Sequence, residues 1–272
     1  MPELPEVETV VRELNRALPG RRIRRVEVFR RDALGRVPTA VFADALRGRG
    51  FGAVGRHGKF LLFPLDPAGF LVAHLRMTGK FILSDPLSAP GRHHRVWFHL
   101  EDGQTLIFQD LRCFGTLAYV ERLEDAPSLA RLGVDPLGAA FTARWLAEAL
   151  SASRAPLKHW LMDQTRIAGL GNIYVSEVLF RAALSPKRRA RRVKPEEARR
   201  LHRAIRTVLR LAIRKNGTTI SDFQRVDEKF GEFQRYLKVY GREGEPCPKC
   251  GAAIRRIPQQ QRSTFYCARC QA

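Results

Sequence analysis

The chain begins with the run Met-Pro-Glu-Leu-Pro-Glu at 1–6, which carries a compact set of groups for chemistry on an electrophilic carbon. A proline in second position is small enough for Met1 to be trimmed, which would leave Pro2 as a secondary amine beside the Glu3 carboxylate. An amine can attack such a carbon, and a neighbouring acid can move protons around it. The alternative is an ordinary Met-Pro start in which Glu3 and Glu6 favour the N-terminus of a helix.

Four of the five cysteines form two CxxC pairs, Cys247 with Cys250 and Cys267 with Cys270, with sixteen residues between the pairs. Two pairs at this separation can place four thiolates tetrahedrally around one zinc ion. A closed four-cysteine site is structural, so the sequence predicts one Zn²⁺ that folds the module and takes no part in the reaction. The fifth cysteine, Cys113, is interpreted as a small buried hydrophobic residue.

The charge balance is strongly basic. Forty-eight Lys and Arg residues face twenty-seven Asp and Glu residues, which gives a net charge of +21 and a pI near 10.9. A polyanion is the expected partner, and nucleic acid is the commonest polyanion. Arginine clusters at 21–25, 188–192 and 199–200 lie within a mixed sequence, which favours a folded basic face over a disordered basic tail. A generally arginine-rich proteome would explain part of this excess.

Neither a signal peptide nor a membrane span is apparent. Glu3, Glu6 and Glu8 occupy the region in which a signal peptide would carry positive charge. No apolar stretch approaches the roughly 20 residues that are needed to span a bilayer. We therefore expect a cytoplasmic protein, associated with the nucleoid if DNA is its partner.

The elements that must position these groups differ between the two halves of the chain. Apolar residues at spacings of four, three and four from Val7 to Leu18 predict an amphipathic helix over 3–18. Strand-like runs separated by turn formers follow to about residue 122, which favours an antiparallel sandwich or barrel. These runs are 23–28, 60–64, 70–75, 95–100, 105–109 and 116–120.

The second half is helical in character. The predicted helices cover 141–150, 157–164, 173–183 and 196–215, and a β-hairpin is expected over 252–266. Residues 218–245 lack a strong period, which fits either a functional or a disordered loop. We expect a catalytic helix and β domain over 1–125, a linker over 126–140, a helical domain over 141–240 and a cysteine module over 241–272.

Short motifs spread along the whole chain resemble those of bacterial formamidopyrimidine-DNA glycosylase. They are Pro-Glu-Leu-Pro-Glu at 2–6, Gly-Lys-Phe-Leu-Leu at 58–62, His-Leu-Arg-Met-Thr-Gly at 74–79, Asp-Leu-Arg-Cys-Phe-Gly at 110–115, Gly-Leu-Gly-Asn-Ile-Tyr at 169–174, Gly-Thr-Thr at 217–219, Val-Tyr-Gly-Arg-Glu-Gly at 239–244 and the cysteine module. The resemblance implies an α+β multidomain fold. In it, an N-terminal helix and a two-layer antiparallel β-sandwich precede a helix–two-turn–helix domain with a C-terminal β-hairpin zinc finger.

The same resemblance implies a monomeric, bifunctional DNA glycosylase and AP lyase that excises 8-oxoguanine and formamidopyrimidines from duplex DNA in base excision repair. The damaged base must first be flipped out of the stack. Pro2 would then attack the sugar C1′ and form a cationic iminium, which makes the C2′ proton acidic and lets the 3′ and then the 5′ phosphate leave. Glu3 would protonate the ring oxygen and shuttle protons. Glu6 either positions the N-terminus or the base, or is only a helix-start carboxylate.

The resemblance also assigns DNA contacts. Phe114 would wedge between bases, Arg112 would hydrogen-bond the orphaned cytosine, and Met77 would pack in the void left by the flipped base. Lys59, which we count with the catalytic residues, matches a phosphate clamp together with Asn172 and Arg262. From residue type alone, Met77 and Phe114 would more often belong to a core.

Further contacts are assigned around the lesion. His93 matches a histidine on the DNA face and Lys158 a lysine near the lesion; the alternatives are a plain loop histidine and an exposed salt-bridged lysine. A loop over about 216–240 would cap the flipped base. Its expected lesion contacts are Thr218, Thr219, Ser221 and Tyr240.

Two stretches depart from the pattern of the family. Residues 227–231 read Asp-Glu-Lys-Phe-Gly where Asp-Gly-x-Pro-Gly is more usual, which changes the turn chemistry of the loop. Residues 110–113 read Asp-Leu-Arg-Cys in place of Asp-Pro-Arg-Arg, so one arginine near the wedge is absent. Both departures bear on the range of lesions and not on the core chemistry.

Two other interpretations compete with this one. The related endonuclease VIII branch removes oxidised pyrimidines, but Leu4, Arg112 and Phe114 favour the purine branch. A non-catalytic zinc-finger DNA-binding protein would account for the basic charge and the cysteines. It would not account for the presence of Pro2 and Glu3 in the same chain as all the other motifs.

Overall fold

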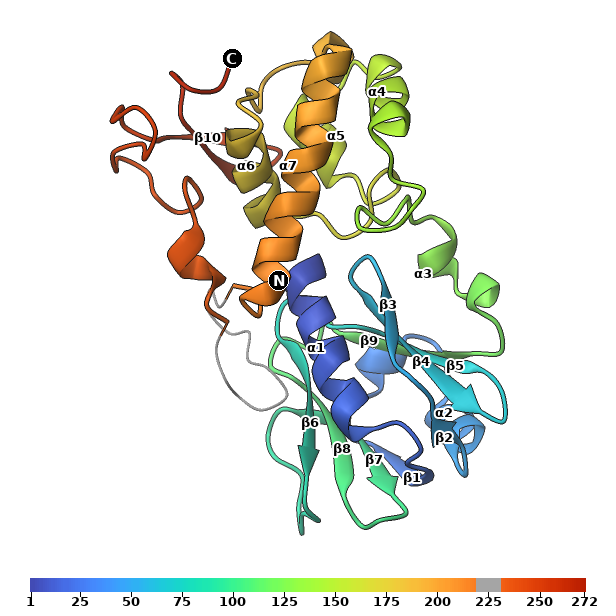
Figure 1. Cartoon of the computed structure of the whole chain (residues 1–272). Helices are drawn as coiled ribbons and strands as arrows, with labels where there is room; N and C mark the ends of the chain where they lie inside the picture. The colour runs from blue at the N-terminus through green and yellow to red at the C-terminus, as the bar shows by residue number, and fades with distance from the viewer. Residues whose placement is uncertain (219–230) are drawn as a thin grey trace. The chain divides into compact units, whose positions relative to one another are not determined.

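The computed structural model describes residues 1–218 and 231–272, and the chain packs into two compact units (Figure 1). The first unit holds Met1–Ala130 with the described ends of the segment 216–232, and the second holds Arg131–Lys215 and Phe233–Ala272. Within the described ranges, no helix combines the length and the apolar character that crossing a membrane requires.

The first unit begins with helix α1 (Leu4–Ala17), close to the predicted 3–18. Pro5 lies in its first turn, where the missing N–H is not needed. The helix buries Val7, Val10 and Leu14, which share one apolar core with residues of both β-sheets. The spacing of apolar residues seen in the sequence is therefore the face that attaches α1 to the sheets.

Two antiparallel sheets form the two layers of this unit. One has the order β1 (Ile23–Val28), β7 (His94–Leu100), β8 (Thr105–Asp110) and β6 (Gly79–Ser84). The other has the order β2 (Gly50–Phe51), β4 (Phe60–Asp66), β5 (Phe70–His74) and β9 (Thr116–Val120), with β3 (Gly55–His57) on β4. Between them, the ring of Phe81 lies 5.2 Å from those of Phe63 and Phe108, so the predicted β-sandwich is confirmed.

The second unit is helical with a terminal hairpin, which also confirms the predicted class. Its helices are α4 (Ala143–Ser151), α5 (Leu157–Met162), α6 (Asn172–Arg181) and α7 (Pro195–Arg214), and its hairpin is β10 (Arg255–Gln259) with β11 (Arg262–Tyr266). Helix α7 starts at Pro195 and buries Leu201, Ile205 and Leu209 along one face. Single 3-10 turns cover Ala190–Arg192 and Phe233–Tyr236.

Several short elements were not expected from the sequence. They are α2 (Thr39–Leu46), α3 (Pro127–Ala130), the strands β2, β3 and β6, and 3-10 turns at Arg31–Leu34 and Leu123–Asp125. Helix α2 buries only Phe42 and Leu46, which is too few positions to reveal a helical period.

Candidate functional site

The start of α1 forms a buried polar cluster. Pro2 is buried, and Glu3 and Glu6 are 3% and 2% exposed. The Glu3 N–H donates to Oε2 of Glu6 at 2.9 Å. Oε1 of Glu6 accepts the N–H of Thr218 at 2.7 Å and its hydroxyl at 2.9 Å. Besides the capping contact at the start of the helix, Glu6 therefore binds the backbone and the hydroxyl of Thr218.

This contact requires a glycine beside Thr218. Gly217 has a φ of +75°, in the left-handed region that favours glycine. A Cβ atom there would lie 2.7 Å from Oε1 of Glu6. Any larger residue would therefore push the chain away from the α1 carboxylate.

Lys59 and His74 lie close to each other at the ends of two paired strands. Lys59 is 6% exposed and precedes β4, whose first residue, Phe60, pairs with His74 on β5. The pKa of His74 is lowered to about 3, mainly by burial and to a lesser extent by the positive charges of Arg76 and Lys59. The neutral ring accepts the Arg76 N–H on Nδ1 at 2.9 Å. His74 was not among the expected site residues, although it begins one of the motifs.

The three residues expected to fill the DNA stack are exposed at turns of the first unit. Met77 is 38% exposed and Phe114 is 52% exposed, and Arg112, two residues before Phe114 in sequence, is exposed as well. The guanidinium carbon of Arg112 lies 4.9 Å from the centre of the Phe114 ring. The carbonyl of His93 accepts the Asp110 N–H at 3.0 Å, directly before the turn of Arg112. A core role for Met77 and Phe114 is therefore excluded.

Two of the expected residues of the second unit meet at the hairpin. Asn172 is the first residue of α6, and its Nδ2 donates to the carbonyl of Ser263 at 3.0 Å. Lys158 is 0% exposed, and its Nζ lies 2.6 Å from Oγ1 of Thr264 and 3.3 Å from the same Ser263 carbonyl. Arg262, one residue earlier, is exposed. Lys158 is thus a buried support of the hairpin rather than an exposed, salt-bridged lysine.

The remaining expected residues belong to the segment 216–240, which was predicted to cap the lesion. Thr219 and Ser221 lie outside the described residues. The ring of Tyr240 contacts that of Phe265 at 5.1 Å, edge to face. The Tyr240 N–H donates at 2.9 Å to Glu177, which accepts the N–H groups of residues 238 and 239 as well. Burial raises the pKa of Glu177, and the three donors oppose this shift. Nothing in the sequence around Glu177 predicted that it would accept the backbone N–H groups of residues 238–240.

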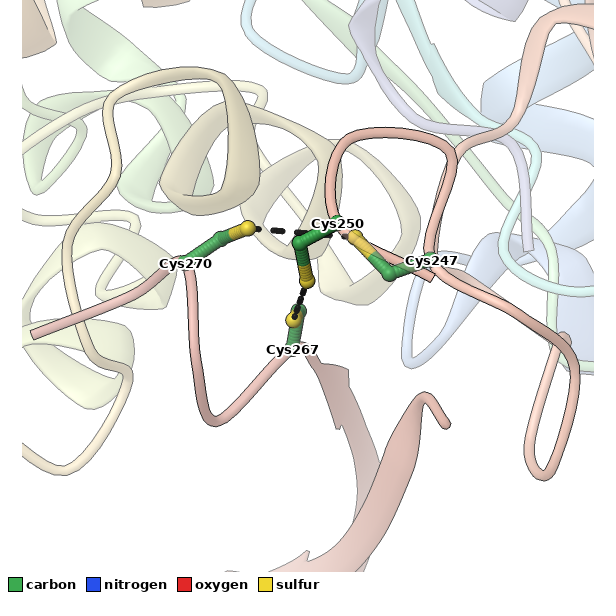
Figure 2. A group of neighbouring side chains, drawn as sticks. All are labelled: Cys247, Cys250, Cys267 and Cys270. Carbon is green, nitrogen blue, oxygen red and sulfur yellow. Dashed lines mark hydrogen bonds between the residues drawn. The ribbon is translucent and has the colours of Figure 1, made fainter. Parts of the chain in front are cut away.

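The four terminal cysteines converge, as Figure 2 shows, with all their sulfurs within 4.8 Å of one another. The Sγ atoms of Cys250 and Cys267 are 3.5 Å apart, and those of Cys247 and Cys270 are 3.9 Å apart. A tetrahedral zinc ion with bonds of about 2.3 Å needs sulfur separations of about 3.8 Å, so the cluster fits one structural Zn²⁺.

Metal binding to these cysteines is coupled to proton release. When no metal is bound, hydrogen bonding among the thiols, chiefly to Cys250, raises the pKa of Cys270 to about 12. Metal uptake must therefore displace protons from this cluster. The module is anchored to its own unit, because Cys247 and Cys267 pack in one cluster with Phe180 of α6.

Fold and site together define a multidomain zinc-finger protein. Family models for the formamidopyrimidine-DNA glycosylase N-terminal domain, the formamidopyrimidine-DNA glycosylase H2TH domain and the zinc finger found in FPG and IleRS match residues 1–117, 132–224 and 244–272. The chain belongs to the formamidopyrimidine-DNA glycosylase family.

Individual relatives agree over the full length. The formamidopyrimidine-DNA glycosylase of Desulfitobacterium hafniense is 43% identical over 274 residues, which is 100% of both chains. The crystal structure of the MutM (FPG) protein from Thermus thermophilus matches with a TM-score of 0.89 and 44% identity, over 99% of this chain and 98% of that one. A complex of Lactococcus lactis FPG with Fapy-dG containing DNA matches with a TM-score of 0.90 and 32% identity, over 99% of each chain.

Proposed function

We propose that this protein is a DNA glycosylase and AP lyase of base excision repair that removes oxidised purines from damaged duplex DNA. The observation that carries the proposal is the buried Pro2-Glu3 pair directly before α1 in a chain of this family. Its substrates are 8-oxoguanine and formamidopyrimidine lesions, and it acts as a monomer. A bacterial cytoplasm with its nucleoid DNA is the location that suits this substrate.

The reaction starts once Met1 is removed and the Pro2 nitrogen is a free secondary amine. This nitrogen attacks C1′ of the flipped nucleotide, the bond from C1′ to the base breaks, and the departing base takes up a proton. Glu3 protonates the sugar ring oxygen, so the ring opens and an iminium forms between Pro2 and C1′. Loss of the C2′ proton expels the 3′ phosphate, and a second elimination expels the 5′ phosphate.

The proposed DNA contacts combine exposed side chains with the buried Lys59. In the first unit, Met77, Arg112 and Phe114 enter the stack, and His93 and Lys59 face the backbone. Intercalating side chains are commonly apolar, which suits the exposed Met77 and Phe114.

In the second unit, Asn172 and Arg262 hold phosphates. For Lys158 we propose a supporting role beneath the hairpin that carries Arg262, since its ammonium is fully buried. Thr218, Thr219, Ser221 and Tyr240 remain the proposed lesion contacts of the segment 216–240. The described start of this segment, 216–218, belongs to the first compact unit, and Tyr240 belongs to the second.

Borohydride trapping tests the proposal, because it reduces an iminium to a stable amine and so links enzyme and DNA covalently. We expect trapping on duplexes with 8-oxoguanine or formamidopyrimidine and little on thymine glycol. Pro2→Gly should lose most trapping, and so should a chain with an uncleaved N-terminal tag, which keeps the Pro2 nitrogen acylated. Undiminished trapping by the tagged chain would overturn the proposed nucleophile, and preference for thymine glycol would favour the endonuclease VIII branch.

A further inference from the structure

The two exposed turns that carry Met77 and Phe114 are joined beneath the surface by Asp110. This residue ends β8 and is 1% exposed. Its Oδ2 accepts the Gly115 N–H at 2.7 Å and its Oδ1 accepts the Arg112 N–H at 3.2 Å. One carboxylate therefore closes the turn 111–114 from below.

Thr78 connects this turn to the other one. It follows Met77 directly and is 8% exposed. Its hydroxyl donates a hydrogen bond to Oδ1 of Asp110 and accepts the Arg112 N–H at 3.0 Å. A single hydroxyl thus bridges the residue after Met77 and the backbone of Arg112.

The β-sheet fixes the position of Asp110. Gly79 of β6 pairs with Asp110 of β8, and the guanidinium of Arg95 donates to the Asp110 carbonyl at 2.7 Å. Gly115 has no room for a side chain, because a Cβ atom there would lie 2.6 Å from the Phe108 ring and 3.1 Å from the Asp110 carboxylate. The turn itself is unfavourable for a free chain, since Cys113 has a φ of 58°.

We propose that Thr78 and Asp110 are positioning residues that hold Met77, Arg112 and Phe114 in one fixed arrangement, so that wedge insertion and reading of the orphaned cytosine occur as one event. This inference rests on the proposed glycosylase function. None of the expected roles covers these two residues, and both side chains are buried. If the turns that carry Met77 and Phe114 moved independently, each would have to be ordered when DNA binds. This entropy cost would weaken DNA binding with the side chains inserted.

Matched threonine variants test the bridge. Thr78→Val keeps the shape and removes the hydroxyl, whereas Thr78→Ser keeps the hydroxyl. Thr105→Val is the control, because Thr105 is 1% exposed in the same sheet and its hydroxyl lies 3.3 Å from Nδ1 of His99, away from the two turns. Single-turnover excision of 8-oxoguanine opposite cytosine and opposite adenine is measured, together with cleavage at a preformed abasic site and the melting temperature.

We expect Thr78→Val to slow excision opposite cytosine at least tenfold and to lower the ratio of cytosine to adenine rates. Cleavage at the preformed abasic site should fall less, because no base has to be expelled from the stack. Thr78→Ser should retain the excision rate and the cytosine-to-adenine ratio of the unmodified protein. Thr105→Val should retain them as well. Asp110→Asn, which replaces an acceptor with a donor, provides a second arm if Thr78→Val folds poorly.

The inference is overturned if Thr78→Val and Asp110→Asn keep the unmodified ratio of cytosine to adenine rates. It is equally overturned if Thr78→Val loses excision and abasic cleavage to the same extent and Thr78→Ser shows the same losses, because that pattern indicates general destabilisation. Failure of the proposed function is distinguished by the unmodified protein, which would then release no 8-oxoguanine in the same assay.

Discussion

Oε1 of Glu6 lies 2.7 Å from the backbone nitrogen of Thr218, and this contact joins residues 212 positions apart. The other oxygen of the same carboxylate accepts the N–H of Glu3, next to Pro2. The proposed nucleophile and the start of the segment proposed to cap the lesion therefore share one buried anchor. Any change to this carboxylate should affect the geometry of both.

Replacing Glu6 with Gln should weaken both folding and trapping. The Gln amide nitrogen cannot accept a hydrogen bond, so at least one of three buried donors loses its partner. We expect the free energy of unfolding to fall by about 1–3 kcal/mol and borohydride trapping to fall about tenfold or more. Urea denaturation and trapping measure these effects. Glu8→Gln is the control, since Glu8 pairs with Arg12 and Arg56 instead; equal behaviour of the two variants would contradict the anchor.

The acid stability of the protein should depend on His74. Its pKa falls from an ordinary value of 6.5 to about 3 on folding, so between these values the unfolded chain binds the proton more readily. Stability should therefore decrease as the pH is lowered from 6.5 towards 3, by at most about 1.4 kcal/mol per pH unit from this residue. His74→Gln does not titrate and should flatten this slope. Urea denaturation at several pH values measures it, and identical slopes for both proteins would refute the assignment.

Metal analysis should find one zinc ion per chain. Cys267→Ser should lose the metal, whereas Cys113→Ser should retain it, because Cys113 lies outside the four-cysteine cluster. A strong chelator should lower the melting temperature and weaken duplex binding, because the hairpin carrying Arg262 lies between the two cysteine pairs. If the chelated protein bound DNA as tightly as the zinc form, the zinc would not organise this contact.

Duplex binding should be steeply salt-dependent, because phosphate contacts release counterions. Arg262→Gln should reduce the slope of log K against log salt by about 0.9, the value for one phosphate contact. Arg144→Gln is a suitable control, since Arg144 already pairs with Glu148 at 2.8 Å. Fluorescence anisotropy at several salt concentrations gives the slopes. A flat response of the unmodified protein would argue against phosphate clamping.

Local patterns predicted most of the longer elements. The period of apolar residues predicted α1 and α7 within one or two residues, because each helix buries one continuous face. The strands β2 and β3 and the helix α2 escaped prediction, since strands of two and three residues and a helix that buries two residues are too short to show a period of their own.

The sequence by itself determined the zinc ligands, the identity of the candidate nucleophile and the family, because CxxC spacing and ordered motifs are local properties of the chain. Only the tertiary structure decided that Glu6 anchors Thr218, that Lys158 lies buried under the hairpin, and that His74 stays neutral. It also decided that Thr78 and Asp110 join the two exposed turns. Burial and hydrogen bonds between residues far apart in the chain set these roles, and neither is encoded in residue type or spacing.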